Sequence, residues 1–525
     1  MRVFRALALG LLVVFALLLV NSRAWPQVAD VPKWSVHEIA LTSDKSYTNP
    51  YTQVSVTATF QEPGEIKKTV EGFWDGDRTF IVRFTPTVQG KWKYTTSSRD
   101  PGLNAKTGTF NCIAPRSQDH GFLRRDANYP YSFVWDDGTH YFMFGQTYYS
   151  ILNLAMVKSN WKTSIDNSLR TGFNKVRFML WPSKRDPDPQ TIPYGRDKDT
   201  LNLLHWRKLD EVVAYMNERG MVADIILLTA YDSDQFGSQS QDERLVRYAI
   251  ARYAAFANVT WCLVNEWNYS PKPQSYWNAM GEFVRNQDPW MSEGKYFRPL
   301  SIHQQTRIDF QFFNETWPVH AIIQYGVRNK RYSEGDEWGN AGILYNLGHK
   351  MPVVNDEYGY IGEYNDRSIK GSPTLTRAKH RQIMWGIYAA GGYASTGDKN
   401  QYSDGRPYFS SYWHEPKEYK DVRLLVNLFT KKGLEYWKMT SQNSVKTSGT
   451  RVYVLGETAK QYAIYAATGG AFSLNLPPGN YSAHLYNPVT GDDIARPDVK
   501  GGGESSFRMP DNYDWVVYLQ RKGNN

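Results

Sequence analysis

Eight short apolar runs alternate with amphipathic segments through the middle of the chain, and this alternation constrains the fold more than any other feature. Each run is a few residues long and bounded by polar or turn residues, which predicts buried strands. The runs are 141–145, 173–180, 221–228, 259–264, 300–304, 321–325, 353–355 and 393–396. Helical spacing predicts helices over 161–170, 204–219, 242–256, 276–286, 341–349, 375–390 and 422–431. Strands and helices in this order indicate a (β/α)8 TIM barrel, although no helical pattern is visible in the fifth unit, between 306 and 317.

Both flanks of this region show period-two alternation instead, which is typical of antiparallel strands. It covers 54–60, 80–84 and 90–94 before the barrel, and 452–455, 462–465, 482–486 and 515–519 after Gly433. The fold class is therefore α/β, a barrel flanked by two antiparallel β-sandwiches. The expected divisions are a signal peptide at 1–24, an N-terminal sandwich at 25–115, a linker at 116–130, the barrel at 131–435 and a C-terminal sandwich at 436–525.

The N-terminus has the features of a secretory signal. Arg2 and Arg5 precede an apolar run over 6–20, and Ser22 and Ala24 then form a small-x-small cleavage pattern. The run is shorter than the ~20 residues that a spanning helix prefers, although an uncleaved anchor stays an alternative. We therefore expect export to a secreted, periplasmic or cell-surface location.

The amino-acid composition limits the classes of molecule that this protein is expected to bind. The net charge is +9, but no basic stripe appears, which argues against nucleic acid. Aromatic residues make up 15% of the chain, and their flat faces suit sugar rings, although core packing accounts for most of them. Cys112 and Cys262 fall in different expected domains, so neither a disulfide framework nor a cysteine-based metal site is expected. No metal, cofactor or protein partner is predicted.

Carboxylates follow two of the expected barrel strands. Asn265 and Glu266 come directly after the fourth strand, and Asp356 and Glu357 after the seventh. The carboxyl ends of barrel strands share one rim, where active sites form. Glycosidic cleavage needs two such groups, one protonated and one ionised.

The Asn-Glu pair after strand four and the Glu after strand seven resemble clan A, the "4/7" retaining glycoside hydrolases, over about residues 131–435. Gly72–Gly76 (GFWDG), Val82–Pro86 (VRFTP) and Gly90–Tyr94 (GKWKY) resemble a domain of unknown function that precedes apiosidase-like barrels. The C-terminal part resembles a domain named for collagen binding in collagenases. A His-Glu-x-x-His zinc motif is absent from the sequence, so peptide hydrolysis is not indicated.

The resemblance implies roles for individual residues. Glu266 would be the acid/base, Glu357 the nucleophile, and Asn265 the partner of the sugar 2-hydroxyl. Arg177 and Tyr325 resemble the arginine and tyrosine that the clan places near the nucleophile; an ordinary rim ion pair and a core tyrosine are the alternatives. The clan often has Trp after strand eight, whereas this chain has none there, so Trp413 on the following loop is the candidate platform.

Other residues after strand ends are candidate sugar contacts, with packing at the rim as the alternative for each. They are Trp181, Trp267, His303 and Tyr358. Asp356 adjoins Glu357, and neighbouring strand residues point to opposite sides, so only one of them faces the site. The Glu-Tyr-Gly sequence matches the clan and favours Glu357.

These features predict a glycoside hydrolase that cleaves O-glycosidic bonds of a plant or microbial polysaccharide or oligosaccharide with retention of configuration. The alternatives are a non-catalytic cell-surface glycan-binding protein and a polysaccharide lyase with a Tyr or His base. No sequence feature defines the sugar, the linkage, or endo or exo action.

Overall fold

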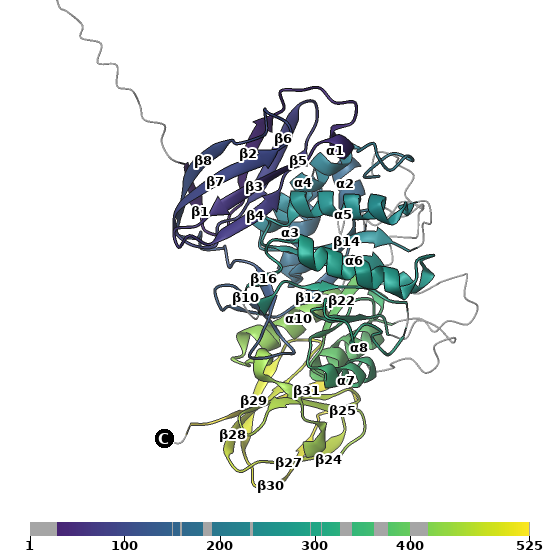
Figure 1. Cartoon of the computed structure of the whole chain (residues 1–525). Coiled ribbons are helices and arrows are strands. Elements are labelled where there is room, and N and C mark those ends of the chain that lie inside the picture. The colour runs from purple at the N-terminus through teal and green to yellow at the C-terminus, as the bar shows by residue number, and fades with distance from the viewer. Residues whose placement is uncertain are drawn as a thin grey trace, which may run out of the picture.

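The computed structural model describes residues 29–149, 151–157, 160–181, 192–230, 235–293, 296–305, 307–325, 339–361, 376–398 and 418–523. A β-sandwich, a barrel and a second β-sandwich follow one another along the chain and also in space (Figure 1). The first sandwich (purple) lies at the top of the view, the barrel in the middle and the second sandwich (yellow) at the bottom. The expected fold class is confirmed.

The N-terminal sandwich has two sheets. One has the order β1-β8-β7-β3-β4, from β1 (Ala29–Pro32), β3 (Val56–Gln61), β4 (Lys67–Glu71), β7 (Gly90–Ser98) and β8 (Thr107–Ile113). The other has the order β2-β6-β5, from β2 (His37–Thr42), β5 (Phe73–Trp74) and β6 (Thr79–Phe84), and the short helix α1 (Pro50–Gln53) lies between β2 and β3. Phe60 and Phe84 stack between the sheets with ring centroids 3.8 Å apart. Inward aromatic residues at alternate positions thus make this core.

Eight parallel strands form the barrel, in the order β18-β15-β14-β13-β12-β22-β20-β19. They are β12 (Phe144–Thr147), β13 (Lys175–Met179), β14 (Val222–Thr229), β15 (Val259–Asn265), β18 (Leu300–Ser301), β19 (Ala321–Ile323), β20 (Val353–Asn355) and β22 (Tyr393–Asp398). Every residue of β14 and β15 is buried, as expected of parallel strands covered on both faces. Among the described residues, β18 and β19 share no ladder, so the barrel is nearly closed.

Helices cover the outside of the barrel. They are α2 (Ile151–Val157), α3 (Lys162–Thr171), α4 (Leu203–Glu218), α5 (Gln239–Tyr253), α6 (Gln274–Gln287), α7 (Ala341–Asn346), α8 (Arg377–Ala389) and α10 (Glu418–Lys431). Local sequence fixes their ends: Ser238 and Gln241 form a capping box at the start of α5, and Gly172, at φ 110°, ends α3. Between β18 and β19 the described residues contain no helix, which agrees with the missing pattern in the fifth unit.

The first barrel strand differs from the prediction. Residues 141–145 were expected to form one strand, but Tyr141 belongs to a separate antiparallel sheet and β12 begins at Phe144. That sheet contains β9 (Leu123–Arg125), β10 (Phe133–Trp135) and β11 (His140–Tyr141), so part of the segment expected to be a linker is a strand. The ring centroids of Phe133 and Tyr393 are 5.4 Å apart, and Tyr393 is the first residue of β22. The sheet therefore covers the amino-terminal end of the barrel. The apolar pattern did not separate the two strands, because Tyr141 of β11 and Phe144 of β12 are both buried and Met143 between them is buried too.

The C-terminal sandwich packs a six-stranded sheet against a three-stranded one. The first has the order β23-β25-β26-β31-β28-β29, from β23 (Thr440–Ser441), β25 (Val452–Glu457), β26 (Gln461–Ala466), β28 (Asn480–Tyr486), β29 (Asp493–Lys500) and β31 (Trp515–Arg521). The second contains β24 (Lys446–Ser448), β27 (Ala471–Leu476) and β30 (Gly503–Arg508). Three short pieces lie in the barrel region: β16 (Ser292–Glu293), β17 (Tyr296–Phe297) and β21 (Tyr360–Ile361).

The two cysteines and the described helices can be compared with the expectations for a disulfide and a membrane anchor. Cys112 and Cys262 are both buried and unpaired, and burial raises the pKa of the Cys112 thiol to about 11. In the part of the chain that the structure describes, no helix is long and apolar enough to cross a membrane. The apolar run over 6–20, expected to be a signal, lies outside the described residues.

Candidate active site

Two carboxylates stand at the carboxyl-terminal rim of the barrel. Glu266 follows β15 directly, Glu357 follows β20 after Asp356, and both glutamates are 7% exposed. Glu266 adopts φ 52° and ψ 59°, a left-handed conformation that is uncommon for a residue other than glycine. Strain of this kind concentrates at functional sites. The turn ends β15 and leads the chain into a short 3-10 helix at Trp267–Tyr269.

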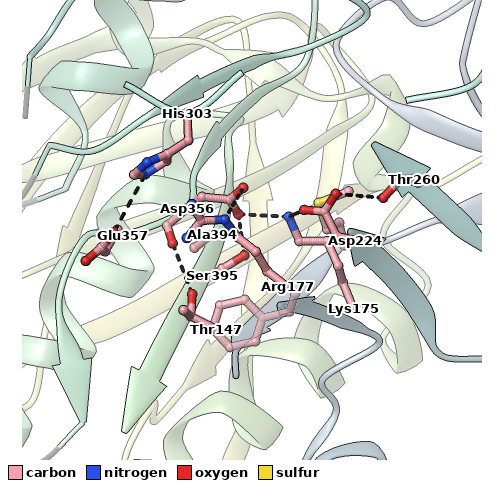
Figure 2. A network of polar contacts seen from close by, with 12 residues as sticks. Thr147, Lys175, Arg177, Asp224, Thr260, His303, Asp356, Glu357, Ala394 and Ser395 are labelled. Carbon is pink, nitrogen blue, oxygen red and sulfur yellow. Dashed lines mark hydrogen bonds and ion pairs between the residues drawn. The ribbon is translucent and has the colours of Figure 1, made fainter. Parts of the chain in front are cut away.

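His303 lies against the backbone of Glu266 and the carboxylate of Glu357. It lies just after β18, is fully buried, and its Nδ1 accepts a hydrogen bond of 3.3 Å from the backbone N–H of Glu266. Because Nδ1 acts as acceptor, the neutral ring carries its proton on Nε2. Nε2 lies 3.7 Å from Oε2 of Glu357, as Figure 2 shows. The imidazole thus holds the end of β15 near the carboxylate that follows β20.

A tyrosine that the sequence analysis did not select also contacts Glu357. The hydroxyl of Tyr149 lies 3.1 Å from Oε2 of Glu357 and accepts a hydrogen bond of 2.9 Å from Nη1 of Arg177. Since Arg177 supplies its proton to the tyrosine oxygen, the hydroxyl proton is available to the carboxylate. Nη2 of Arg177 donates to Oδ1 of Asn265. One guanidinium therefore orients both Tyr149 and Asn265.

Tyr149 was missed because of the shifted first strand. Placing that strand at 141–145 put its end two residues too early, whereas β12 ends at Thr147 and Tyr149 follows it closely. The rule that identified Glu266 and Glu357 would have identified Tyr149 from the correct strand end.

Asp356 belongs to a different set of contacts, inside the barrel. Its Oδ1 lies 2.8 Å from Nζ of Lys175 and also accepts a hydrogen bond from Ser395, and its Oδ2 lies 3.8 Å from Nε of Arg177. Lys175 reaches Oδ2 of Asp224 as well, at 3.2 Å (Figure 2). Burial disfavours the charged form of Asp356, but Lys175 and Arg177 outweigh it and hold the pKa of that carboxyl well below its usual range. Asp356 is thus an ionised partner of two cations.

Two protein-family models match this chain, one in the barrel and one in the N-terminal sandwich. The family model described as "Apiosidase-like, catalytic domain" matches residues 130–399, more than half of the chain. The chain belongs to the apiosidase-like family. A second model, a domain of unknown function (DUF5060), matches residues 30–99, within the N-terminal sandwich.

Solved structures share the fold of this apiosidase-like chain. A protein from Bacteroides vulgatus ATCC 8482, provisionally described as a glycoside hydrolase, covers 94% of this chain with 100% of its own, at 23% identity and a TM-score of 0.79. A family 5 glycoside hydrolase from the same organism covers 77% of this chain with 94% of its own, at 13% identity and a TM-score of 0.62. At these identities the likeness concerns the fold, which is that of glycoside hydrolases.

A curated relative matches a short segment. The major extracellular endoglucanase of Xanthomonas campestris pv. campestris is 39% identical over 64 residues, which are 12% of this chain and 13% of the relative. The chain thus spans only a small part of that protein's length.

Two tryptophans were also predicted to contact the sugar. Trp267 lies beside the carboxylates, because its backbone N–H donates to the carbonyl of His303 at 3.0 Å. Trp181 lies two residues after the end of β13, is 8% exposed and contacts Tyr194 at 5.0 Å between ring centroids.

Two predicted tyrosines make other contacts, and their predicted roles at the site stay predictions. The ring of Tyr325 lies against α7, where a Cβ on Gly342 would be 3.0 Å from Cδ1 of the tyrosine. Tyr358 is 1% exposed, and its hydroxyl lies 3.1 Å from Nε2 of His380 on α8. Trp413 lies outside the described residues. Among the residues that are described, no group of three or more His, Cys, Asp or Glu side chains is arranged to hold a metal ion.

Proposed function

We propose that this chain hydrolyses O-glycosidic bonds of a plant or microbial polysaccharide or oligosaccharide by a retaining double displacement. The observation that carries the proposal is that Glu266 and Glu357 follow β15 and β20 at one rim, where His303 contacts the backbone N–H of Glu266 and lies 3.7 Å from Oε2 of Glu357. Retaining enzymes need their two carboxyl groups ~5 to 5.5 Å apart, and inverting enzymes ~6.5 to 9.5 Å. We assign the pair to the shorter class because the Asn-Glu after strand four and the Glu after strand seven resemble the retaining enzymes of clan A.

Glu357 is the nucleophile and Glu266 the acid/base in this mechanism. A carboxylate oxygen of Glu357 bonds to the anomeric carbon as the glycosidic C–O bond breaks, and the leaving oxygen takes the proton of Glu266. Water then gives a proton to the Glu266 carboxylate and attacks the same carbon, which releases Glu357. Two inversions at one carbon give net retention.

The neighbouring polar residues support these steps. Arg177 is fully buried, and the anionic groups around it, which include Asp356, outweigh the effect of burial and keep its pKa above the usual value. Arg177 donates hydrogen bonds to Tyr149 and Asn265, so the cation acts on the site through these two side chains. We assign to Asn265 the contact with the sugar 2-hydroxyl, and to Trp181 and Trp267 contacts with the sugar rings. Trp413 stays the candidate platform beyond strand eight.

Variants of the two glutamates test the reaction. A panel of plant and microbial polysaccharides and aryl glycosides first identifies a substrate for the unmodified chain. Glu357→Ala is expected to abolish turnover, and azide should not restore it with the parent configuration. Glu266→Ala is expected to keep activity on aryl glycosides with good leaving groups, where azide yields a glycosyl azide of retained configuration.

The configuration of the first product separates the mechanisms. NMR of the freshly formed sugar should show the anomer of the substrate, and an inverted anomer contradicts the double displacement. An unsaturated product that absorbs in the ultraviolet would instead identify a lyase. Binding without turnover on any substrate, with both glutamates intact, would support the glycan-binding alternative.

The proposal extends to the ends of the chain. The two sandwiches supply stability or polymer binding rather than chemistry, and residues 1–24 are removed on export. Mass spectrometry of the exported protein tests the second point, because an intact N-terminus would indicate an anchor.

A further inference from the structure

A cavity of about 460 Å³ lies far from the carboxylates, at the amino-terminal end of the barrel. One wall comes from the N-terminal sandwich, at Trp34, and the other from the small sheet β9-β10-β11, at Arg124, Trp135 and His140. β11 precedes β12, and Glu357 stands beyond the opposite ends of the barrel strands. In Figure 1, β10 lies on the side of the barrel between the two sandwiches. Cavities of ~300 to 1,000 Å³ are typical of ligand sites.

Aromatic residues line the cavity on both walls. Trp135 is partly exposed, and its ring contacts with Tyr141 at 5.3 Å and with His120 at 6.2 Å are edge-on and tilted, so neither ring is stacked on the indole. Trp34 adopts φ 66°, a strained conformation for so bulky a residue. Its ring is held against Gly121, where a Cβ would lie 2.8 Å from the indole. Nζ of Lys33 lies 4.0 Å from the centroid of the same ring, so Trp135 rather than Trp34 offers a ring face to a ligand. Backbone strain of this kind concentrates at functional sites.

Arg124 supplies a buried polar group on the same wall. The residue is 1% exposed, its Nε donates to Asp136 at 2.8 Å, and its Nη1 donates to the carbonyl of Trp290 at 2.6 Å. Its Nη2 is buried and has no hydrogen-bond partner in the described part of the chain. A buried N–H pair without an acceptor is costly, and a ligand hydroxyl would satisfy it.

The charges around the cavity balance. Lys33 and Arg124 are cations, whereas Asp126 and Asp136 are carboxylates. Burial lowers the pKa of His140, although Asp126 opposes this, so the imidazole is neutral at pH 7. A neutral lining with aromatic faces and charged hydrogen-bonding groups suits a ligand that is uncharged and rich in hydroxyls.

A second cavity, of about 310 Å³, continues along the same side of the molecule and shares His140 with the first. It lies between the barrel and the segment that leads into the C-terminal sandwich. His140 stacks on Trp437 with ring centroids 4.2 Å apart, so an aromatic pair separates the two cavities. Adjacent sites with an aromatic boundary suit consecutive units of a chain rather than one small molecule.

We propose that these cavities form a second, non-catalytic binding site for neutral sugar units of a polysaccharide, at the end of the barrel opposite to Glu266 and Glu357. Trp135 provides the face for a sugar ring, and Arg124 donates to a hydroxyl. The site would hold a polymer independently of the chemistry at the other rim, so it does not depend on the proposed hydrolysis.

Affinity electrophoresis of the full chain tests the site. The probes are hydroxyethyl cellulose, xyloglucan, galactomannan, arabinoxylan and, as the anionic polymer, polygalacturonate. Trp135→Ala is expected to weaken retardation by a neutral polymer at least tenfold, and Thr87→Trp, which adds bulk at the cavity wall, is expected to weaken it in the same way. Tyr513→Ala, which removes a 74% exposed aromatic on the C-terminal sandwich, is the matched control and should leave retardation unchanged.

Two measurements separate this site from the catalytic rim and from misfolding. Turnover of a small aryl glycoside by Trp135→Ala and Thr87→Trp should stay within twofold of the unmodified chain, and their melting temperatures should show a folded protein. Unchanged retardation in both variants, retardation only by polygalacturonate, or no retardation of the unmodified chain by any of these polymers would overturn the proposal.

Discussion

Tyr149 gives the most direct residue-scale prediction, because its hydroxyl contacts both Glu357 and Arg177. Tyr149→Phe keeps the ring and removes the hydroxyl. Hydrogen bonds to charged groups contribute ~1.5 to 3 kcal/mol, so kcat should fall by about 10- to 100-fold. Tyr141→Phe is the control, because that hydroxyl bonds to Asn174 at the other end of the barrel and its loss should leave kcat unchanged. Equal losses of kcat in both variants would contradict a role for Tyr149 at Glu357.

Lys175 and Asp356 give a prediction for stability. Lys175→Met leaves the fully buried Asp356 without its nearest cation, and breaking a buried pair from one side costs ~3 to 5 kcal/mol. The pKa of Asp356 is held below its unfolded value of ~3.9, so the pair contributes fully above about pH 4 and its contribution is lost as pH falls below that. Urea unfolding at pH 7 and pH 3.5 should therefore show a smaller difference between the two proteins at the lower pH. A constant difference would exclude this linkage.

Strand ends in the sequence were enough to predict part of the candidate site. Glu266, Asn265, Arg177 and His303 do lie together with Glu357, because parallel strands bring residues after their ends to one rim. Lys175 could not be found in this way. A lysine inside a barrel strand is tolerated only because Asp224 on β14 and Asp356 after β20 face it, and those pairings depend on register around the closed sheet.

The strands next to β12 pack so closely against Gly145 that a larger residue there should destabilise the barrel. A Cβ on Gly145 would lie 2.1 Å from Oγ of Ser395 on β22 and 2.8 Å from Cε of Lys175 on β13. Gly145→Ala should therefore cost ~1 to 3 kcal/mol of unfolding free energy in urea, because neighbouring strands must shift. Gly348→Ala is the control, since its Cβ would meet nothing within 4 Å. A neutral effect at Gly145 would show that the strands accommodate the methyl group.

The lengths of strands five and six could not be predicted from the local apolar pattern. The runs 300–304 and 321–325 were expected as full strands, but β18 and β19 contain only Leu300–Ser301 and Ala321–Ile323. The backbone after β18 still follows β15, because the N–H of His303 donates to the carbonyl of Val264 at 3.2 Å. The apolar pattern thus gave the position of the strand, whereas its length depends on partners far along the chain.

At the scale of the whole molecule, the two sandwiches are attached differently. The N-terminal sandwich shares one continuous hydrophobic core with the barrel. Arg83 on β6 is buried against Asp210 of α4 at 2.7 Å and donates to the carbonyl of Arg252 at 2.7 Å. The C-terminal sandwich has an additional core of its own, which contains Val454 and Ile464. The contacts of Arg83 join segments more than a hundred residues apart, so sequence pattern alone does not predict them.

The C-terminal sandwich should therefore unfold as a separable unit when its contact with the barrel is weakened. Asp514 accepts two hydrogen bonds from Arg381 of α8, at 2.8 and 2.7 Å, and both residues are buried. Trp385 on the same helix stacks on Tyr465 at 5.7 Å. Asp514→Ala leaves the Arg381 cation buried beside one fewer carboxylate, which costs ~3 to 5 kcal/mol.

Calorimetry is the measurement that resolves this effect. In Asp514→Ala, a transition of the C-terminal sandwich should move to lower temperature, while the transition that contains the barrel and the N-terminal sandwich should shift much less. Asp498→Ala removes an exposed ion pair with Lys522 on the same sandwich and should leave both transitions in place, because exposed pairs contribute little. A single transition that moves as a whole in Asp514→Ala would instead mean that the three parts unfold as one cooperative unit.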